Sequence, residues 1–351
     1  MEMNIIHKIK QSRDFIDRNG SYYFSRRRAH KIRNELIRQR GYKVVNHKTK
    51  RSIKAYAKDT FGSKSFWPWL ALYTEIRGEF IEGWLPDDYY TVNLLKKLNA
   101  ETAKICNYKS FDYRIFPDFS LKPVISIISG SVLNSSGDRI EFSEARKLLD
   151  DCRREIVVKE DSGKGGSNVL FIDSVKLDLN QLSKNKSYII QPALKQHELL
   201  GRINPRSVNT IRVFTYQKKN GGIVVKFAYF RFGSGESRVD NSSSGGGMCK
   251  IKNSGYLDEI AYDKSGMALG DQNPQTGMRY SSVKIPAFNE ILEKCIQSHE
   301  KYRYLRFIGW DVAVNSEGKP VLLEWNSEPN LWKAEALYGP YWLEELKKQE
   351  I

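Results

Sequence analysis

The sequence predicts an α+β protein whose N-terminal region is basic and mainly helical. Apolar residues recur at roughly helical spacing within residues 22–40, among many arginines and lysines. From Tyr108 onward, aromatic, proline and β-branched residues alternate in the short runs typical of strands. Near the C-terminus, two apolar runs in residues 307–330 flank a turn rich in Asn, Ser and Gly, which is the pattern of a β-hairpin.

Composition narrows the class of protein. The 351 residues are enough for two or three packed domains, and the 40% hydrophobic content is typical of a globular chain. No apolar run reaches the length of a membrane span and the N-terminus carries no secretory signal, so we expect a cytoplasmic protein. The four cysteines are scattered singly, which favours neither a zinc site nor a disulfide framework.

Much of the net charge of +16 lies in residues 1–60, which hold 17 Lys and Arg against 5 Asp and Glu. A cationic helix of this kind is either simply solvated, or it contacts an anionic membrane surface or another anionic polymer. A membrane contact would place the protein peripherally at the inner membrane face. We do not expect sequence-specific nucleic-acid binding, because no motif of that class is present.

Residues 61–108 are aromatic-rich and predict helices that pack through their tryptophans. A further helix is expected at Glu141–Arg153, with Ser143 as its N-cap. The stretch EIVVKEDSGKGGSNVLFID then predicts a strand ending at Lys159, a glycine-rich loop and a second strand. Such a loop brings backbone N–H groups close to an anion, or it is a purely structural turn. Its glycines are Gly163, Gly165 and Gly166.

The chain continues with a short strand at Tyr188–Leu194 and two strands that carry Arg212 and Arg231. The arginines place fixed positive charge where phosphate charge would develop, or they are ordinary structural arginines. A serine–glycine run follows and predicts a loop that closes over a ligand, with a mobile linker as the alternative. The candidate substrate-binding residues of this loop are Asp240, Asn241, Gly245, Gly246 and Gly247.

The hairpin carries the strongest functional pattern. With a four-residue loop at Ser316–Lys319, Asn315 pairs with Pro320, and Asp311 lies directly opposite Glu324. Side chains alternate between the two faces of a strand. One face then holds Gly309, Asp311, Ala313, Leu322, Glu324 and Asn326. The other face is wholly apolar and is expected to be buried; it holds Ile308, Trp310, Val312, Val314, Val321, Leu323 and Trp325.

Two carboxylates on neighbouring strands repel each other unless a cation lies between them. Asp311, Glu324 and Asn326 all offer oxygen ligands, and the small residues Gly309 and Ala313 leave room beside them. Mg²⁺ prefers oxygen and commonly completes its shell with water and nucleotide phosphate. The hairpin therefore predicts a magnesium site, with a solvated strand face as the alternative.

The pattern D-x₁₂-E-x-N resembles the metal-binding signature of the ATP-grasp superfamily. YKSFDYRIFPD, NTIR, the DN…GGG loop, the Ile285-Pro286 pair before a helix and IGWDV…LLEWN together resemble its sugar-transfer-associated family, which is related to teichuronopeptide biosynthesis enzymes. The resemblance covers roughly residues 100–335. It implies an ATP-grasp fold with two α+β lobes, giving a basic helical region at 1–100, a first lobe at 101–190 and a second lobe at 191–351.

The resemblance also implies roles for individual residues. Asp311, Glu324 and Asn326 would hold two Mg²⁺ ions against the phosphates of ATP. Lys109 and Lys159 would contact the phosphates, the backbone of residues 191–194 would meet adenine, and His197 would reach the ribose unless it is a surface histidine. The implied nucleotide-binding set is Lys109, Lys159, Gly163, Gly165, Gly166, Ser167, Gln191, Pro192, Ala193, Leu194 and His197.

ATP-grasp enzymes typically activate a carboxylate as an acyl phosphate, which an amine then attacks. The resemblance therefore implies an ADP-forming carboxylate–amine ligase in which Arg212 and Arg231 are catalytic. Its substrate would be a uronic acid, an amino sugar or an amino acid, in the synthesis of capsule, exopolysaccharide or lipopolysaccharide. Two alternatives are a phosphotransferase that uses the same site and a non-catalytic basic protein that binds glycan or membrane.

Overall fold

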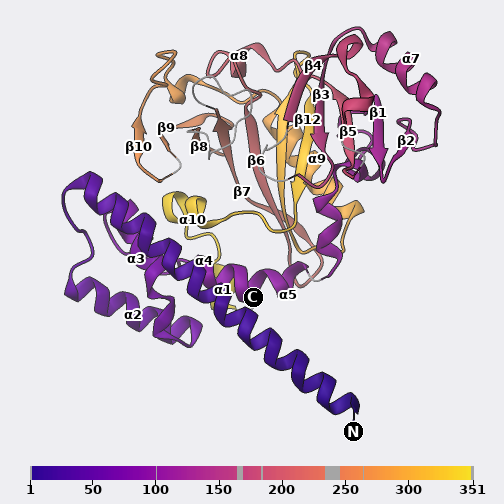
Figure 1. Cartoon of the computed structure of the whole chain (residues 1–351). Helices are drawn as coiled ribbons and strands as arrows, with labels where there is room; N and C mark the ends of the chain where they lie inside the picture. The colour runs from indigo at the N-terminus through magenta and orange to yellow at the C-terminus, as the bar shows by residue number, and fades with distance from the viewer. Residues whose placement is uncertain are drawn as a thin grey trace. The chain divides into compact units, whose positions relative to one another are not determined.

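The computed structural model describes residues 2–99, 101–163, 169–182, 185–233, 246–263 and 265–348. Contacts along the chain divide it into two compact units. The helical unit consists of Met1–Ala100, Ser265–Met267 and Asn330–Ile351, and the sheet unit consists of Glu101–Lys264 and Ala268–Pro329. Figure 1 shows both units coloured along the sequence.

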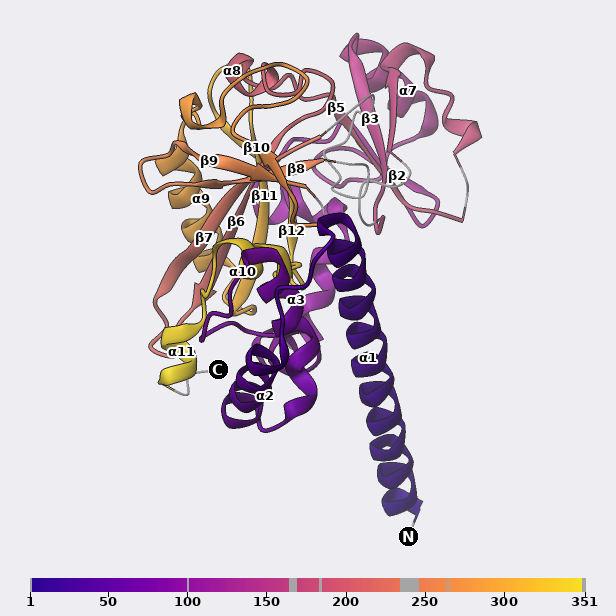
Figure 2. The same ribbon diagram turned by 90° about the vertical axis from the view of Figure 1, so that its left-hand side faces the viewer.

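The helical unit confirms the predicted helical N-terminal region. It contains α1 (Glu2–Arg40), α2 (His47–Phe61), α3 (Trp67–Arg77), α4 (Asp87–Tyr89), α5 (Leu95–Asn99), α10 (Trp332–Tyr338) and α11 (Leu343–Lys347). Figure 2 shows the long helix α1 over its full length. The core of this unit is aromatic, as the tryptophan-rich sequence suggested, because Trp69, Trp84 and Trp332 are fully buried.

Some of the basic side chains of α1 are used inside the helical unit. Arg33 Nη2 lies 2.8 Å from Oε1 of the fully buried Glu75, and Arg26 Nε lies 2.9 Å from Asp88 Oδ2. The Glu75 carboxylate also accepts hydrogen bonds from the backbone N–H groups of Val44 and Val45. These partners satisfy charges that would be costly to bury alone.

The first sheet of the sheet unit has five antiparallel strands in the order β2-β1-β5-β3-β4. The strands are β1 (Ile125–Ile128), β2 (Ser131–Leu133), β3 (Glu155–Glu160), β4 (Val169–Asp173) and β5 (Tyr188–Pro192). Helix α7 (Phe142–Cys152) packs Ala145 and Leu149 against Ile156 and Ile190. Ser143 is not its N-cap, because Glu141 holds that position without a side-chain hydrogen bond. The expected lobe boundary at 190/191 lies inside β5.

The second sheet has seven antiparallel strands in the order β10-β9-β8-β7-β6-β11-β12. They are β6 (Thr210–Gln217), β7 (Ile223–Phe232), β8 (Gly247–Ile251), β9 (Leu257–Tyr262), β10 (Ala268–Gly270), β11 (Phe307–Val314) and β12 (Pro320–Asn326). Helix α9 (Phe288–Lys301) follows Ile285-Pro286, as expected, and packs Phe288, Ile291 and Cys295 into the core of this sheet. The order places β11 beside β6, about a hundred residues away in sequence.

The predicted hairpin register is correct at the acidic pair and wrong further along. Asp311 is opposite Glu324, but Val314, and not Asn315, pairs with Pro320. The turn therefore has five residues, and the pairing shifts by one residue after Asp311, where β12 contains a bulge. The bulge turns Leu322 into the apolar core and leaves Leu323 half-buried, which is the reverse of the predicted faces.

Short helical segments lead from the start of the sheet unit to its first sheet. They are the 3₁₀ helices Glu101–Asn107 and Lys109–Phe111, and α6 (Asp112–Ile115). The stretch 109–121 bonds to both sheets. Ser110 donates to Asp161 beside the first sheet, and Phe119 O accepts from the backbone N–H of Leu322 in the second. Residues 193–196 follow β5 and lead the chain from the first sheet toward the second.

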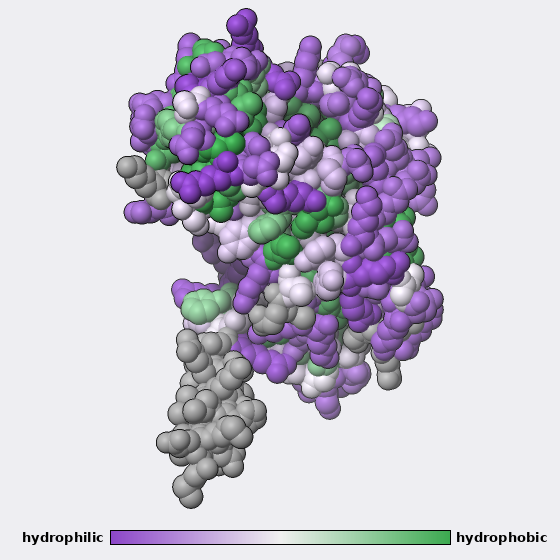
Figure 3. All heavy atoms as spheres, turned by 90° about the vertical axis from the view of Figure 1, so that its right-hand side faces the viewer, coloured by the Kyte–Doolittle hydropathy of each residue, from purple (hydrophilic) through white to green (hydrophobic). Residues whose placement is uncertain are grey.

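In the described part of the chain, no helix combines the length and the apolar character needed to cross a bilayer. Figure 3 shows one face of the molecule, on which hydrophilic side chains predominate and hydrophobic ones lie between them. The four cysteines are free, as their scattered positions suggested.

Candidate functional site

The acidic pair of the hairpin lies on one face of the seven-stranded sheet. Asp311 on β11 is directly opposite Glu324 on β12, and Gly309 is opposite Asn326. Because side chains alternate along strands, these groups project from the same face. A Cβ atom at position 309 would lie 2.6 Å from Pro329 Cβ. The absence of a side chain at Gly309 therefore accommodates Pro329, and not a ligand as expected.

Two arginines on neighbouring strands surround Asp311. Arg212 on β6 donates through Nε and Nη2 to the two carboxylate oxygens, the second bond measuring 2.6 Å. Arg231 Nη1 on β7 lies 3.1 Å from Asp311 Oδ1. Burial opposes ionisation of Asp311, but the guanidinium groups outweigh it and hold the pKa of this carboxyl below its usual value. The fold thus brings both predicted arginines to the acidic face, while their catalytic role stays a prediction.

Both predicted lysines act on the charge of the acidic face. Lys109 Nζ donates to Gly163 O, at the start of the glycine-rich loop. Burial, followed by the ammonium of Lys109, lowers the pKa of Lys159, while nearby carboxylates including Glu324 raise it. Burial and then the charge of Asp311 raise the pKa of Glu324, and both lysines oppose this effect. Lys159 lies on the first sheet and Glu324 on the second, so side chains from both sheets contribute charge to the same region.

The structure adds Asp112, which the sequence did not single out. This residue begins α6, is buried, and accepts a 2.9 Å hydrogen bond from Trp325 Nε1. Burial and the neighbouring Glu324 hold the pKa of Asp112 well above its usual value, against the effect of Lys109 and Lys159. The clue was in the motif YKSFDYRIFPD, where Asp112 follows Lys109 by about one helical turn.

A small cleft of about 120 Å³ opens beside these groups. The residues that line it are Cys106, Asn107, Lys109, Gly163, Glu324, Asn326, Ser327 and Glu328. Asn326 Nδ2 is buried and has no hydrogen-bond partner among the described residues. A buried amide without a partner costs about 1–3 kcal/mol, and an oxygen of a bound phosphate would satisfy it.

The donor set of the acidic face fits Mg²⁺ that arrives with a nucleotide. Among the residues that the structure describes, no three His, Cys, Asp or Glu side chains group closely enough to hold a metal ion by themselves. Glu324 and Asn326 instead offer a carboxylate and an amide on one face. Asp311 adds the remaining lone pair of Oδ2, because Arg212 and Arg231 both donate to Oδ1 and Arg212 also donates to Oδ2. Mg²⁺ commonly takes one or two protein carboxylates and completes its octahedral shell with water and substrate phosphate oxygens.

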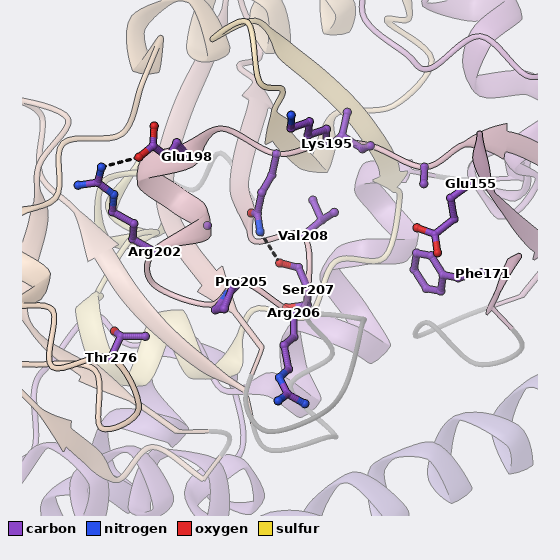
Figure 4. Close-up of a pocket in the computed structure, with 14 residues that line it drawn as sticks. Glu155, Phe171, Lys195, Glu198, Arg202, Pro205, Arg206, Ser207, Val208 and Thr276 are labelled. Atoms are coloured by element: carbon purple, nitrogen blue, oxygen red, sulfur yellow. Dashed lines mark hydrogen bonds and ion pairs between the residues drawn. The ribbon is translucent and has the colours of Figure 1, made fainter. Parts of the chain in front are cut away.

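A larger cavity, of about 530 Å³, lies where the chain passes from the first sheet to the second. Figure 4 shows Glu155 and Phe171 on one side of it, and the ion pair of Glu198 with Arg202 on another. Ala193 and Leu194, which the resemblance assigns to adenine, also line this cavity. Its volume falls within the range of small-molecule sites.

The other predicted hinge residues do not line that cavity. Gln191 is buried in β5, accepts a 3.2 Å hydrogen bond from Lys159 Nζ and donates to Leu121 O at 3.1 Å. Its side chain therefore positions a lysine of the site. Pro192 ends β5. His197 is the N-cap of α8 (Glu198–Gly201), because its Nδ1 accepts from Leu199 N at 3.2 Å.

The glycine run is placed only in part. Gly247 is not in a loop as expected but begins β8, where a Cβ atom would lie 2.3 Å from Phe232 Cζ. At Gly246, a Cβ atom would lie 2.5 Å from Phe232 O. Close packing against β7 thus accounts for both glycines. The other predicted loop residues, Gly165, Gly166, Ser167, Asp240, Asn241 and Gly245, lie outside the described residues.

Two antiparallel sheets, with Lys159 on the first and an acidic strand pair on the second, fit the class of ATP-grasp proteins. The model of the family described as sugar-transfer associated ATP-grasp matches residues 96–350, and the chain belongs to this family. The fold is accordingly an ATP-grasp-like α+β fold preceded by a helical region. Membership implies ATP-dependent, ADP-forming ligase chemistry.

Solved structures with a similar fold include the ATP-grasp ligase PsnB complexed with minimal precursor, Mg and ADP, at 11% identity and a TM-score of 0.40, covering 72% of this chain and 62% of that one. Biotin carboxylase from Campylobacter jejuni is 10% identical, with a TM-score of 0.42 and coverage of 70% and 46%. N5-carboxyaminoimidazole ribonucleotide synthetase from Thermotoga maritima is 10% identical, with a TM-score of 0.37 and coverage of 64% and 42%. The chain thus spans less than two thirds of the length of these structures. No curated protein sequence matches it.

Proposed function

We propose that the protein is an ATP-dependent carboxylate–amine ligase that forms an amide on a sugar or an amino acid in surface polysaccharide synthesis. The observation that carries the proposal is the small cleft that Lys109 and Gly163 line together with Glu324 and Asn326 of the second sheet. Opposed cations and oxygen donors of this kind suit a triphosphate with its metal. The polysaccharide setting rests on the sugar-transfer association of the family.

In the proposed reaction, an oxygen of the substrate carboxylate attacks the γ-phosphorus of ATP, and the bond to the β-phosphate oxygen breaks to release ADP. The amine nitrogen then attacks the acyl carbon, phosphate leaves with the bonding electrons, and the amine loses a proton. Two Mg²⁺ ions held by Asp311, Glu324 and Asn326 would supply positive charge to the phosphate oxygens.

The side chains of the site contribute binding, positioning and charge. Lys159 on the first sheet and Lys109 in the short helix that precedes this sheet would contact the phosphates. The backbone of the hinge would meet adenine in the larger cavity. Arg212 is oriented by its paired hydrogen bonds to Asp311, so its guanidinium stays fixed while charge develops on the phosphoryl group. Arg231 would act beside it. No covalent attachment to the protein is required.

The test incubates the full chain with ATP, Mg²⁺ and pairs of candidate acids and amines, chosen from uronic acids, amino sugars and amino acids. ADP release that requires both partners, with an amide detected by mass spectrometry, is the expected result. Glu324→Gln should lower turnover by roughly a hundredfold or more, because it removes a charged metal ligand. Glu317→Gln, in the exposed turn of the same hairpin, is the matched control and should keep full activity.

Two outcomes would replace the proposal. A stable phosphorylated product without an amide identifies a phosphotransferase that uses the same site. Failure of the protein to bind or hydrolyse Mg·ATP under any condition indicates a non-catalytic member with a degenerate nucleotide site.

A further inference from the structure

Helix α1 of the helical unit has two distinct faces. Residues at spacings of three and four point inward and pack or pair within the unit; they are Arg26, Ala29, Arg33, Leu36 and Arg40. A second stripe, offset along the same helix, is exposed; it contains Phe24, Arg27, Lys31 and Arg38. The inward arginines have structural partners. In the exposed stripe Arg38 pairs with Glu35 at 2.9 Å, and Arg27 and Lys31 leave this stripe with a net positive charge.

Aromatic rings accompany the cations of the exposed stripe. Phe24 is 69% exposed and Tyr23 is 61% exposed, and their rings contact each other edge to face with centroids 5.6 Å apart. Both rings therefore lie largely in water. Exposed aromatic groups of this kind mark contact surfaces more often than isolated apolar residues do.

The neighbouring helix α2 adds two half-buried lysines, which a shared tryptophan links to α1. Lys50 Nζ and Lys54 Nζ on α2 lie 4.5 and 5.5 Å from the ring centroid of the half-buried Trp67. The ring of His30 on α1 lies 5.3 Å from the same indole and links the two helices. Residues 18–60 hold 14 Lys and Arg against 2 Asp and Glu. Asp88 and Glu75, from outside this range, pair with Arg26 and Arg33, so the region keeps a large excess of positive charge.

We propose that this surface, formed by Tyr23, Phe24, Arg27, Lys31 and Arg38 of α1 with Lys50 and Lys54 of α2, docks the protein on an anionic lipid bilayer. Lysine and arginine near such a bilayer are attracted by its negative surface potential, and aromatic rings settle at the level of the head groups. The outer face of a single helix is convex, which suits a deformable bilayer surface. Single-stranded nucleic acids are bound instead in grooves where bases stack.

The test uses the full chain and flotation with vesicles of phosphatidylcholine alone, or of phosphatidylcholine and phosphatidylglycerol at three to one. We expect binding to the anionic vesicles that weakens as salt is raised. The variant Arg27→Glu/Lys31→Glu/Arg38→Glu should bind them about 100-fold more weakly. Its matched control carries the same change of net charge on exposed lysines of the sheet unit, Lys122→Glu/Lys147→Glu/Lys301→Glu, and should bind like the wild type.

A second variant separates a bilayer from a soluble polyanion. Tyr23→Ser/Phe24→Ser should weaken vesicle binding by roughly tenfold and leave binding to single-stranded poly(dT) unchanged, because only a bilayer gains from apolar insertion. Circular dichroism and ATP turnover, unchanged in all variants, establish that they fold. The proposal is overturned if the wild type treats both vesicles alike, if both triple variants lose binding equally, or if the aromatic variant loses poly(dT) binding as much as vesicle binding.

Discussion

A buried histidine that packs against the seven-stranded sheet should make the stability of the sheet unit sensitive to mild acid. His299 on α9 is fully buried; its Nδ1 lies 2.7 Å from Thr215 Oγ1 and its Nε2 lies 2.8 Å from Leu305 O. Thr215 Oγ1 also accepts from Trp310 Nε1 at 2.8 Å. Burial lowers the pKa of His299 from its ordinary 6.5 to about 4.

The direction in which pH changes the unfolding free energy follows from which state binds the proton. Between pH 6.5 and 4 the unfolded chain protonates this imidazole and the folded chain does not, so the free energy of unfolding falls as the pH falls. The loss is negligible at pH 7, reaches about 2 kcal/mol at pH 5 and levels off at about 3 kcal/mol below pH 4. His299→Gln removes this proton uptake and provides the reference.

The assay is native-state hydrogen exchange of the β6 and β11 amides at several pH values, which reports unfolding of the sheet unit. The difference in unfolding free energy between wild type and His299→Gln should shrink by about 2 kcal/mol from pH 7 to pH 5. The carboxylates titrate in both proteins, so their contributions to the unfolding free energy cancel in this difference. Curves that stay parallel over this range would refute the reasoning, because they would mean that His299 has an ordinary pKa in the folded protein.

Three further changes test the site and its support. Arg212→Lys loses a paired hydrogen bond to a buried carboxylate and should lower kcat by a hundredfold or more. Arg231 has one 3.1 Å contact to Asp311, so Arg231→Lys should lower kcat less. Steady-state kinetics compares the two variants. Gly247→Ala places a methyl group against a ring of β7 and should lower the unfolding free energy by about 1–3 kcal/mol. Gly20→Ala, which has open space around it, should not lower it. Thermal melting of the two variants tests this difference. Asp112→Asn keeps an acceptor for the neighbouring indole but replaces a carboxyl group that can exchange a proton beside Glu324 and the lysines. KM for ATP should therefore change while Tm stays within a few degrees; nucleotide titration and thermal melting check the two expectations.

The sequence allowed the acidic pair to be placed correctly, but for a reason that was partly wrong. The predicted four-residue turn is one residue too short, and the unpredicted bulge restores the register before Asp311 meets Glu324. Alternation of apolar and polar residues cannot reveal a bulge, because a bulge interrupts that alternation. Leu322 and Leu323 are both apolar, so nothing in their identity showed which of them would enter the core.

Contacts between distant segments were beyond reach of the sequence. Arg212 and Asp311 are 99 residues apart, and their pairing depends on β6 lying beside β11, which strand patterns do not specify. The same limit applied to Arg33 and Glu75, since helical spacing shows which face of α1 is apolar but not which arginines have buried partners. The lysines of the site were found because a family motif surrounds each of them.

In the described part of the sheet unit, residues 109–121 and residues 193–196 each form hydrogen bonds to both sheets or their turns, and these two connections have a mechanical consequence. A body attached to another at two separate places can swing about the line that joins them, but it cannot slide or spin independently. Along the described chain, such a swing would change the separation of Lys159 from Glu324 while Asp311 and Arg212, both on the second sheet, keep their spacing. Opening and closing would then alter how the phosphates are gripped without disturbing the acid–guanidinium pair.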